Sequence, residues 1–132
     1  MKKSIILCLM LFLTISFFTS ARVITSHPAG GNWASPDTWL GGQVPIDKDD
    51  AVLISKVEIT DSLTVKNVLV NEGGTLTIKT AGDKIVSITD TLEVNGGLAV
   101  LKNSFLRVLV FIHSENAQLI NESIIEVGKC DK

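Results

Sequence analysis

Two tryptophans are the clearest candidates for ligand chemistry. Trp33 and Trp39 lie in a segment rich in glycine and proline, and exposed indole faces stack well on sugar rings. One interpretation is therefore that the two rings form a carbohydrate-binding platform. The interpretation that we favour is that both rings cover the end of a stack of strands, because tryptophan buries a large apolar area.

A run of aspartates is the strongest candidate for a metal site. Asp47, Asp49 and Asp50 offer the hard oxygen ligands that calcium prefers. They lack the twelve-residue spacing of an EF-hand loop and the glycine-rich nonapeptide of calcium-binding β-rolls. We therefore expect a solvated turn here, with no bound metal and no other cofactor.

Motifs for catalysis are absent from the sequence. His27 and His113 are far apart and have no metal-ligand spacing, and no G-x-S-x-G motif occurs. Glycosidases and polysaccharide lyases need paired carboxylates or basic groups in a groove. Glu58, Glu93 and Glu126 are expected to face outward, but no pair can be chosen from spacing alone. The sequence therefore predicts a protein without catalytic activity.

Residues 1–21 have the three parts of a secretory signal peptide. Met1-Lys2-Lys3 is basic, an apolar run extends from Ile5 to Phe18, and Thr19-Ser20-Ala21 supplies small residues for cleavage. The run is shorter than the roughly 20 residues that a membrane-spanning helix needs. We expect cleavage after Ala21, a mature chain that begins at Arg22, and a location outside the cytoplasm, secreted or on the cell surface.

Charge and cysteine content exclude further classes of function. Loss of Lys2 and Lys3 would leave 10 basic and 14 acidic residues, a formal net charge of −4. This balance offers no basic surface for nucleic acid. Loss of Cys8 would leave Cys130 alone, so neither an intramolecular disulfide nor a cysteine-based metal site is expected.

Residues 51–127 alternate apolar and polar side chains with a period of two, which is typical of strands. The phrase Glu72-Gly73-Gly74-Thr75-Leu76-Thr77-Ile78 returns as Asn95-Gly96-Gly97-Leu98-Ala99-Val100, and more weakly as Asn116-Ala117-Gln118-Leu119-Ile120. A 22-residue interval separates successive members of a series of apolar residues: Ile54, Leu76, Leu98 and Ile120. We expect these four, with Leu119 as the alternative last member, to stack in one inward ladder.

This repeat predicts an all-β fold, a short right-handed parallel β-helix (β-solenoid) of three to four coils over residues 51–132. The alternative is a small antiparallel β-sandwich. A solenoid needs its ends covered, and residues 22–50, rich in Trp, Pro and Gly, are expected to form the N-terminal cap. Within that cap, Ser35-Pro36 is a good start for a single helical turn.

The segment Phe105–His113 is apolar on both faces of any strand it forms. We expect Leu106, Val108, Val110 and Ile112 to face the core. Phe105, Leu109 and Phe111 would then face outward beside Arg107 and His113. Such a strand is either covered by another segment, a contact surface or prone to aggregate.

One segment of the sequence resembles a known family. It contains Gly31-Asn32-Trp33, Pro36, Thr38-Trp39, Gly41-Gly42 and Val44-Pro45, and it is followed by Asp49-Asp50. It is similar to the N-terminal entry segment of bacterial secreted right-handed parallel β-helix proteins and to the start of G8 domains. G8 domains occur in cell-surface proteins, including hyaluronan-degrading ones. The resemblance implies a β-helix with either an adhesive or a carbohydrate-related role.

The sequence as a whole favours an exported structural or adhesive β-helix module with no catalysis. Its expected partners are an extracellular polysaccharide or another surface protein. The alternative is an N-terminal fragment of a carbohydrate-active β-helix enzyme, a polysaccharide lyase or glycosidase. The C-terminal coil has only short polar sequence after it, so we also expect either self-association through that coil or continuation into more protein. The alternative is that residues 114–127 fold back as their own cap.

Overall fold

A computed structural model describes residues 22–128 of the chain. The predicted signal peptide at 1–21, its cleavage site and the lone Cys130 lie outside the described residues. Within them, every element is a strand except one 3-10 turn, η1 (Pro36–Thr38). No helix in this part of the chain is long and apolar enough to span a membrane.

The strands are short, and most have four residues or fewer. They are β1 (Val23–Thr25), β2 (Gly31–Asn32), β3 (Asp50–Leu53), β4 (Lys56–Ile59), β5 (Leu63–Val65), β6 (Asn67–Val70), β7 (Thr75–Ile78), β8 (Val86–Val94), β9 (Gly97–Val100), β10 (Phe105–His113), β11 (Gln118–Asn121) and β12 (Ile124–Val127).

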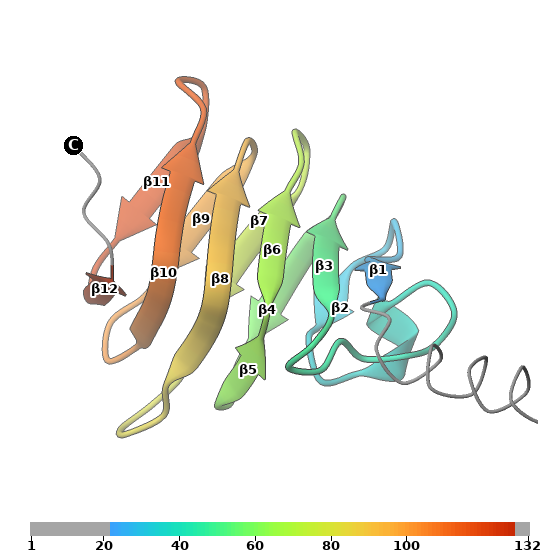
Figure 1. Cartoon of the computed structure of the whole chain (residues 1–132), viewed down its shortest axis with the longest axis horizontal. Helices are drawn as coiled ribbons and strands as arrows, with labels where there is room; N and C mark the ends of the chain where they lie inside the picture. The colour runs from blue at the N-terminus through green and yellow to red at the C-terminus, as the bar shows by residue number, and fades with distance from the viewer. Residues whose placement is uncertain (1–21, 129–132) are drawn as a thin grey trace, which may run out of the picture.

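All strand pairs are parallel, as a solenoid requires. One sheet has the order β1-β3-β6-β8-β10-β12, with β5 also paired to β8, and the other has the order β11-β9-β7-β4-β2. Each strand lies beside the equivalent strand of the next turn of chain, so the strands stack side by side along one axis (Figure 1). The chain is therefore a parallel β-solenoid of about four turns, and the antiparallel sandwich is excluded.

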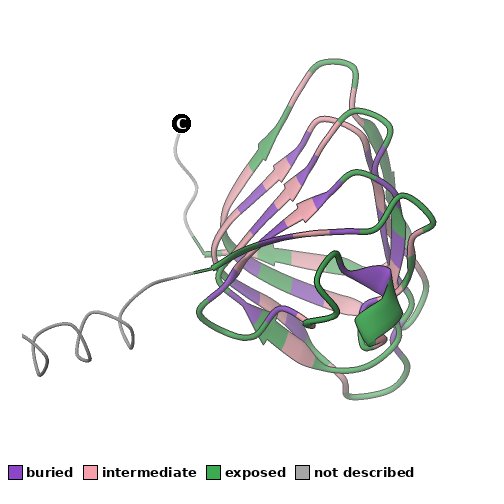
Figure 2. Ribbon diagram, turned by 90° about the vertical axis from the view of Figure 1, so that its right-hand side faces the viewer, coloured by how far each residue is buried: buried purple, intermediate pink, exposed green. Residues whose placement is uncertain are grey.

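Each complete coil has three faces, and the view along the stack is roughly triangular (Figure 2). The nine-residue strands β8 and β10 bend around one corner. The first half of β8 pairs with β5 and its second half pairs with β6, so the two halves belong to different faces. The first face thus carries β5 and β12 with the first halves of β8 and β10. The second carries β1, β3 and β6 with the second halves. The third carries β2, β4, β7, β9 and β11.

The inward ladder of the third face differs from the expected one at its first member, and its last member is Leu119, because Ile120 pairs with Ala99 and is 56% exposed. Register places Val57 against Leu76, Leu76 against Leu98, and Leu98 against Leu119. Ile54 was wrongly predicted in this ladder: it lies in the bend between β3 and β4 and is 38% exposed. The reason is that coils differ in length, since Val57 precedes Leu76 by 19 residues while Leu98 follows it by 22.

The predicted orientation of β10 is correct for its first half and wrong for its second. Leu106 and Val108 are buried as expected, but the pairing with β8 shifts register between Val108 and Val110. After this bulge Phe111 pairs with buried Leu92, and Ile112 lies exposed. The extra residue lies in β8, which takes three steps from Ile88 to Thr91 where β10 takes two from Val108 to Val110. The unequal count reverses which β10 side chains point inward, so Phe111 and His113 replace Val110 and Ile112 on the inner side.

The N-terminal segment lies at one end of the stack. Its strands β1 and β2 already pair with β3 and β4, and η1 lies beyond them. Ser35 is the N-cap residue of η1 and Pro36 its first residue, as predicted, although the Ser35 side chain makes no capping hydrogen bond. Trp33 and Trp39 belong to the same buried cluster as the first coils.

Candidate functional site

A groove of about 500 Å³ crosses the third face of the solenoid. It lies over the starts of β7, β9 and β11 and the turns that precede them, so three successive coils contribute to it. Its polar lining comes from Glu72, Thr75, Asn95, Asn116 and Gln118. The groove therefore runs along the stacking axis, across the strands.

Small side chains on the middle strand make the hollow. Register sets Gly97 between Thr75 and Gln118. By the same register, Ala99 lies between Thr77 and Ile120. The larger groups of β7 and β11 form the walls, and β9 forms the floor.

The glycines of this region have two different roles. A Cβ at Gly96 would lie 2.2 Å from the Gly74 carbonyl oxygen, and one at Gly74 would lie 2.3 Å from the Leu53 carbonyl oxygen. Both positions need glycine because the stacked turns approach one another closely. At Gly97 the nearest neighbour of a Cβ would be the Thr75 hydroxyl oxygen at 3.2 Å. The backbone does not exclude a side chain there, so glycine at 97 keeps the floor of the groove open.

The chemistry of the lining suits a neutral, hydroxyl-rich ligand. Asn95, Asn116 and Gln118 carry amides, each of which both donates and accepts hydrogen bonds. Glu72 is the single carboxylate of the lining, and no lysine or arginine contributes to it. Coils stack about 4.8 Å apart, so these polar groups recur at short intervals along the groove.

A second hollow, on the second face, offers less to a ligand. It lies over β3, β6 and the second half of β8 and measures about 330 Å³. Its polar groups bond to one another: the Asn67 amide donates to Asp50 at 2.9 Å and accepts from the Thr91 backbone N–H at 3.0 Å. In the third-face groove the Asn95 amide donates to Glu93 at 3.3 Å, but no such pairing links Asn116 or Gln118 to other described side chains. The third-face groove is therefore the better candidate.

The structure separates the carboxylates that sequence analysis considered for catalysis. Glu58 lies in β4 on the third face, Glu93 in β8 on the second, and Glu126 in β12 on the first. Glu126 is also paired with Arg107 at 3.2 Å. Three side chains on three faces cannot act on one glycosidic bond, so none of them forms an acid pair with another.

The histidines and aspartates are likewise apart or already engaged. His27 follows β1 at one end of the stack, and His113 ends β10 near the other. Asp49 is bonded to Arg22 and Asp50 to Asn67. Within residues 22–128 no three His, Cys, Asp or Glu side chains are grouped so that they could hold a metal ion.

Trp33 and Trp39 are inaccessible to a ligand. Their exposed fractions are 3% and 2%, and their ring centroids lie 4.7 Å apart in an edge-to-face contact. The Trp39 indole N–H donates to the Trp33 carbonyl oxygen at 2.8 Å. A sugar platform needs an exposed indole face, and neither ring has one. The geometry agrees with the end-covering interpretation of this pair.

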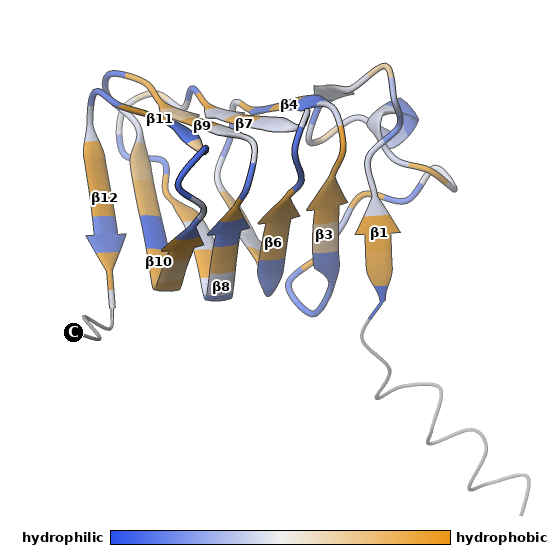
Figure 3. Cartoon of the chain, turned by 90° about the horizontal axis from the view of Figure 1, so that it is seen from above, coloured by the Kyte–Doolittle hydropathy of each residue, from blue (hydrophilic) through white to orange (hydrophobic). Residues whose placement is uncertain are grey.

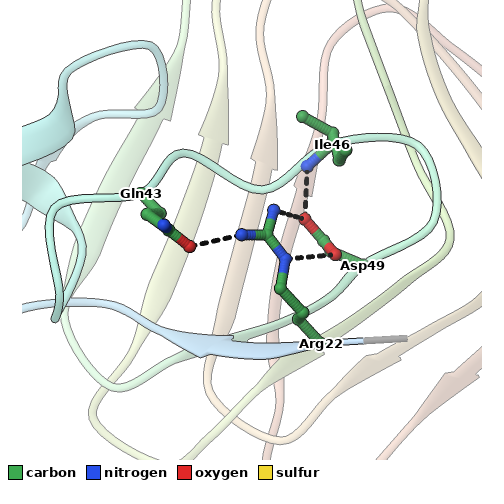
Figure 4. Close-up of polar contacts among 4 residues, drawn as sticks. All are labelled: Arg22, Gln43, Ile46 and Asp49. Carbon is green, nitrogen blue, oxygen red and sulfur yellow. Dashed lines mark hydrogen bonds and ion pairs between the residues drawn. The ribbon is translucent and has the colours of Figure 1, made fainter. Parts of the chain in front are cut away.

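Asp49 has a structural role that sequence analysis missed (Figure 4). Its side chain is 3% exposed and accepts from Arg22 Nη2 at 2.8 Å, from Arg22 Nε at 3.2 Å and from the Ile46 backbone N–H at 2.9 Å. Arg22 also donates to Gln43. Burial raises the pKa of Asp49, but the hydrogen bonds from Arg22 and Ile46 outweigh it and hold the pKa below its ordinary value. These contacts fasten the start of β1 to the loop before β3.

The signal for the groove was present in the repeated phrase itself. Asn95-Gly96-Gly97 was used only as evidence for a repeat, although the phrase also carries information on the size of the outward side chains. When Leu76 is aligned with Leu98, Gly97 takes the position of Thr75 and Ala99 that of Thr77, so small residues replace larger ones at the outward positions. The register that places these small residues between the larger ones of β7 and β11 is known only from the structure.

Comparisons with protein-family models, with curated proteins and with solved structures find no match for this chain. The resemblance to G8 domains and to bacterial secreted β-helix proteins therefore stays an expectation. The parallel β-solenoid itself is established by the structure.

Proposed function

We propose that the chain is an exported, non-catalytic module with a structural or adhesive role, and that it binds a neutral polysaccharide along the third-face groove. The observation that carries the proposal is the groove itself, with amide side chains on successive coils around a floor of Gly97 and Ala99. Export rests on the predicted signal peptide at residues 1–21.

Charge favours a neutral over an acidic polymer. A polyanion such as hyaluronan or polygalacturonate would meet Glu72 and find no cation in the lining. A neutral glycan would instead exchange its hydration for hydrogen bonds to Asn95, Asn116 and Gln118, each of which contributes about 0.5–1.5 kcal/mol. A polymer that extends over three coils would gather several such contacts at once.

Affinity electrophoresis tests this proposal directly. The purified chain would be run through gels that contain galactomannan, soluble β-glucan or hydroxyethyl cellulose, with polygalacturonate and hyaluronan as acidic counterparts. We expect retardation by at least one neutral polymer and by neither acidic one. Retardation by the acidic polymers alone, or by none of the five, would contradict the proposal.

Matched variants locate the site. Asn95→Ala combined with Asn116→Ala removes two amides at about 0.5–1.5 kcal/mol each, so affinity should fall roughly 5- to 150-fold. Thr64→Ala, an exposed change on the first face, should leave affinity unchanged. Equal affinity for both variants would place binding elsewhere.

An assay for new reducing ends on the same polymers separates binder from enzyme. We expect none, because the candidate carboxylates lie on different faces. Release of reducing ends that scales with protein concentration would favour the carbohydrate-active alternative.

A further inference from the structure

The lining of the third-face groove has a polar side and an apolar side. The polar side is formed by the turns, since Glu72, Asn95 and Asn116 lie just before β7, β9 and β11. The apolar side lies further along the strands, where Ala99 pairs with Ile120 in an outward row. Ile120 is 56% exposed, so its side chain is available to a ligand. A ligand that fits this groove therefore needs a polar edge and an apolar face.

The groove is three coils long. Its lining comes from β7, β9 and β11 with the turns before them, and Figure 3 shows these strands side by side with β4 as the next neighbour. On β4 the register sets Lys56 beside Thr75 and Glu58 beside Thr77. These two longer side chains stand where the groove would continue toward the N-terminal end. A bound chain that follows the groove therefore crosses three strands in a straight line.

A glycan with a straight backbone has the shape that this lining requires. Sugar rings joined by equatorial bonds, as in β-1,4-linked glycans, form a flat and extended ribbon whose faces carry C–H groups and whose edges carry hydroxyls. Each sugar advances the ribbon by nearly the same length as one step between coils, about 4.8 Å. The ribbon therefore places one sugar over each coil of the groove. Chains with α-1,4 or β-1,3 linkages curve into helices, so their successive sugars leave this straight line.

We propose that the groove selects extended, β-1,4-linked neutral glycans over helical ones and binds one sugar on each of its three coils. This inference rests on the polysaccharide binding proposed above and adds the shape of the chain that is bound. The ring faces lie on Gly97, Ala99 and Ile120, and one hydroxyl edge meets the amides of Asn95 and Asn116. Successive sugars of the ribbon are turned over, so this edge presents different hydroxyls in turn. An amide suits each of them because it both donates and accepts hydrogen bonds.

Isothermal titration calorimetry on the unaltered chain tests this selection. Cello-, manno- and xylo-oligosaccharides of two to six sugars represent extended chains, and malto- and laminari-oligosaccharides of the same lengths represent helical ones. We expect the tetrasaccharide of at least one extended series to bind at least about tenfold more tightly than maltotetraose and laminaritetraose, since a curved chain loses hydrogen bonds to the amides. In that series affinity should rise up to three or four sugars and then level off, because the groove spans three coils.

A larger side chain in the floor tests where the ribbon lies. Ala99→Leu fills the groove between Thr77 and Ile120. It should weaken binding of the best tetrasaccharide at least about tenfold, because the ring faces are lifted and the amides lose their hydrogen bonds. Ser87→Leu adds the same side chain between Thr64 and Arg107 on the first face and should leave affinity unchanged. Circular dichroism of both variants checks that the fold is kept.

The outcomes separate this inference from the function on which it rests. Malto- or laminari-oligosaccharides that bind as tightly as the extended series would overturn the selection and leave the binding of a neutral glycan in place. The absence of binding in every series would contradict both. Affinity that still rises from four to six sugars, or a folded Ala99→Leu that binds like the unaltered chain, would overturn the placement of one sugar on each coil. The comparison of linkages needs no variant, so it decides the question even if Ala99→Leu fails to fold.

Discussion

Truncation of Leu76 to alanine should destabilise the chain far more than the same change at Ile54. Leu76 is fully buried in the middle of the third-face ladder, between Val57 and Leu98. Its neighbours are fixed by strand pairing on both sides, so the space left by the lost side chain cannot collapse. Ile54 is 38% exposed in a bend and is not part of the ladder.

The magnitudes follow from burial. Leu76→Ala should cost about 2–5 kcal/mol, the transfer free energy of the lost atoms together with a cavity contribution. At about 4 °C for each kcal/mol in a domain of this size, Tm should fall by about 8–20 °C. Ile54→Ala should change stability by less than about 1 kcal/mol, since half-exposed sites outside the core have small effects.

Urea unfolding followed by two probes is the appropriate assay. Circular dichroism reports strands in all coils, whereas the fluorescence of Trp33 and Trp39 reports the N-terminal end. We expect a midpoint lower by roughly 1–3 M urea for Leu76→Ala, and almost no shift for Ile54→Ala. Equal destabilisation by the two variants would indicate that Ile54 stacks with Leu76, as the even 22-residue interval predicts, and would refute the register described above. Small effects from both would refute the solenoid core.

Three further predictions concern the first coil, the turns and the N-terminus. Because the pKa of Asp49 is lower in the folded chain, its contribution to stability is present above the unfolded pKa of about 3.9 and is lost as pH falls below it. Asp49→Asn should therefore lower the urea midpoint at pH 7 and reduce the loss of stability between about pH 5 and 2; an unchanged acid profile would contradict this role. Gly96→Ala should cost about 1–3 kcal/mol because its Cβ would meet the Gly74 carbonyl, and Gly97→Ala clearly less; thermal denaturation that ranks them in reverse would contradict the packing. Mass spectrometry of exported protein should find Arg22 as the first residue, and a retained Met1 would contradict cleavage.

The period-two alternation was sufficient to predict the fold class and much of the core. It identified Leu76 and Leu98 as stacked inward residues and Leu106 and Val108 as core positions, and the structure confirms all four. Such positions are predictable because a strand has only two sides and one of them must be buried. The repeated phrase with its pair of glycines predicted a parallel β-helix, and the structure confirms the parallel pairing.

What alternation could not supply was register. The short first coil moved the ladder from Ile54 to Val57, and one bulge after Val108 exchanged the roles of Phe111 and Ile112. Both differences depend on the number of residues at each corner of a coil. That number is set by the strand pairing between coils and cannot be predicted from local alternation. The contact between Arg22 and Asp49 joins residues 27 apart in sequence without any local pattern, so composition alone suggested a solvated turn.

Nuclear magnetic resonance titration with a neutral oligosaccharide measures the central claim most directly. Backbone amide shifts of the ¹⁵N-labelled chain would be followed while a hexasaccharide of the neutral polymer that retards it best is added. We expect saturable shifts confined to residues 72–75, 95–99 and 116–120, the turns and strands that form the groove. Shifts centred on Trp33 and Trp39, shifts confined to the first or second face, or no shifts at all would contradict the assignment of this groove as the binding site.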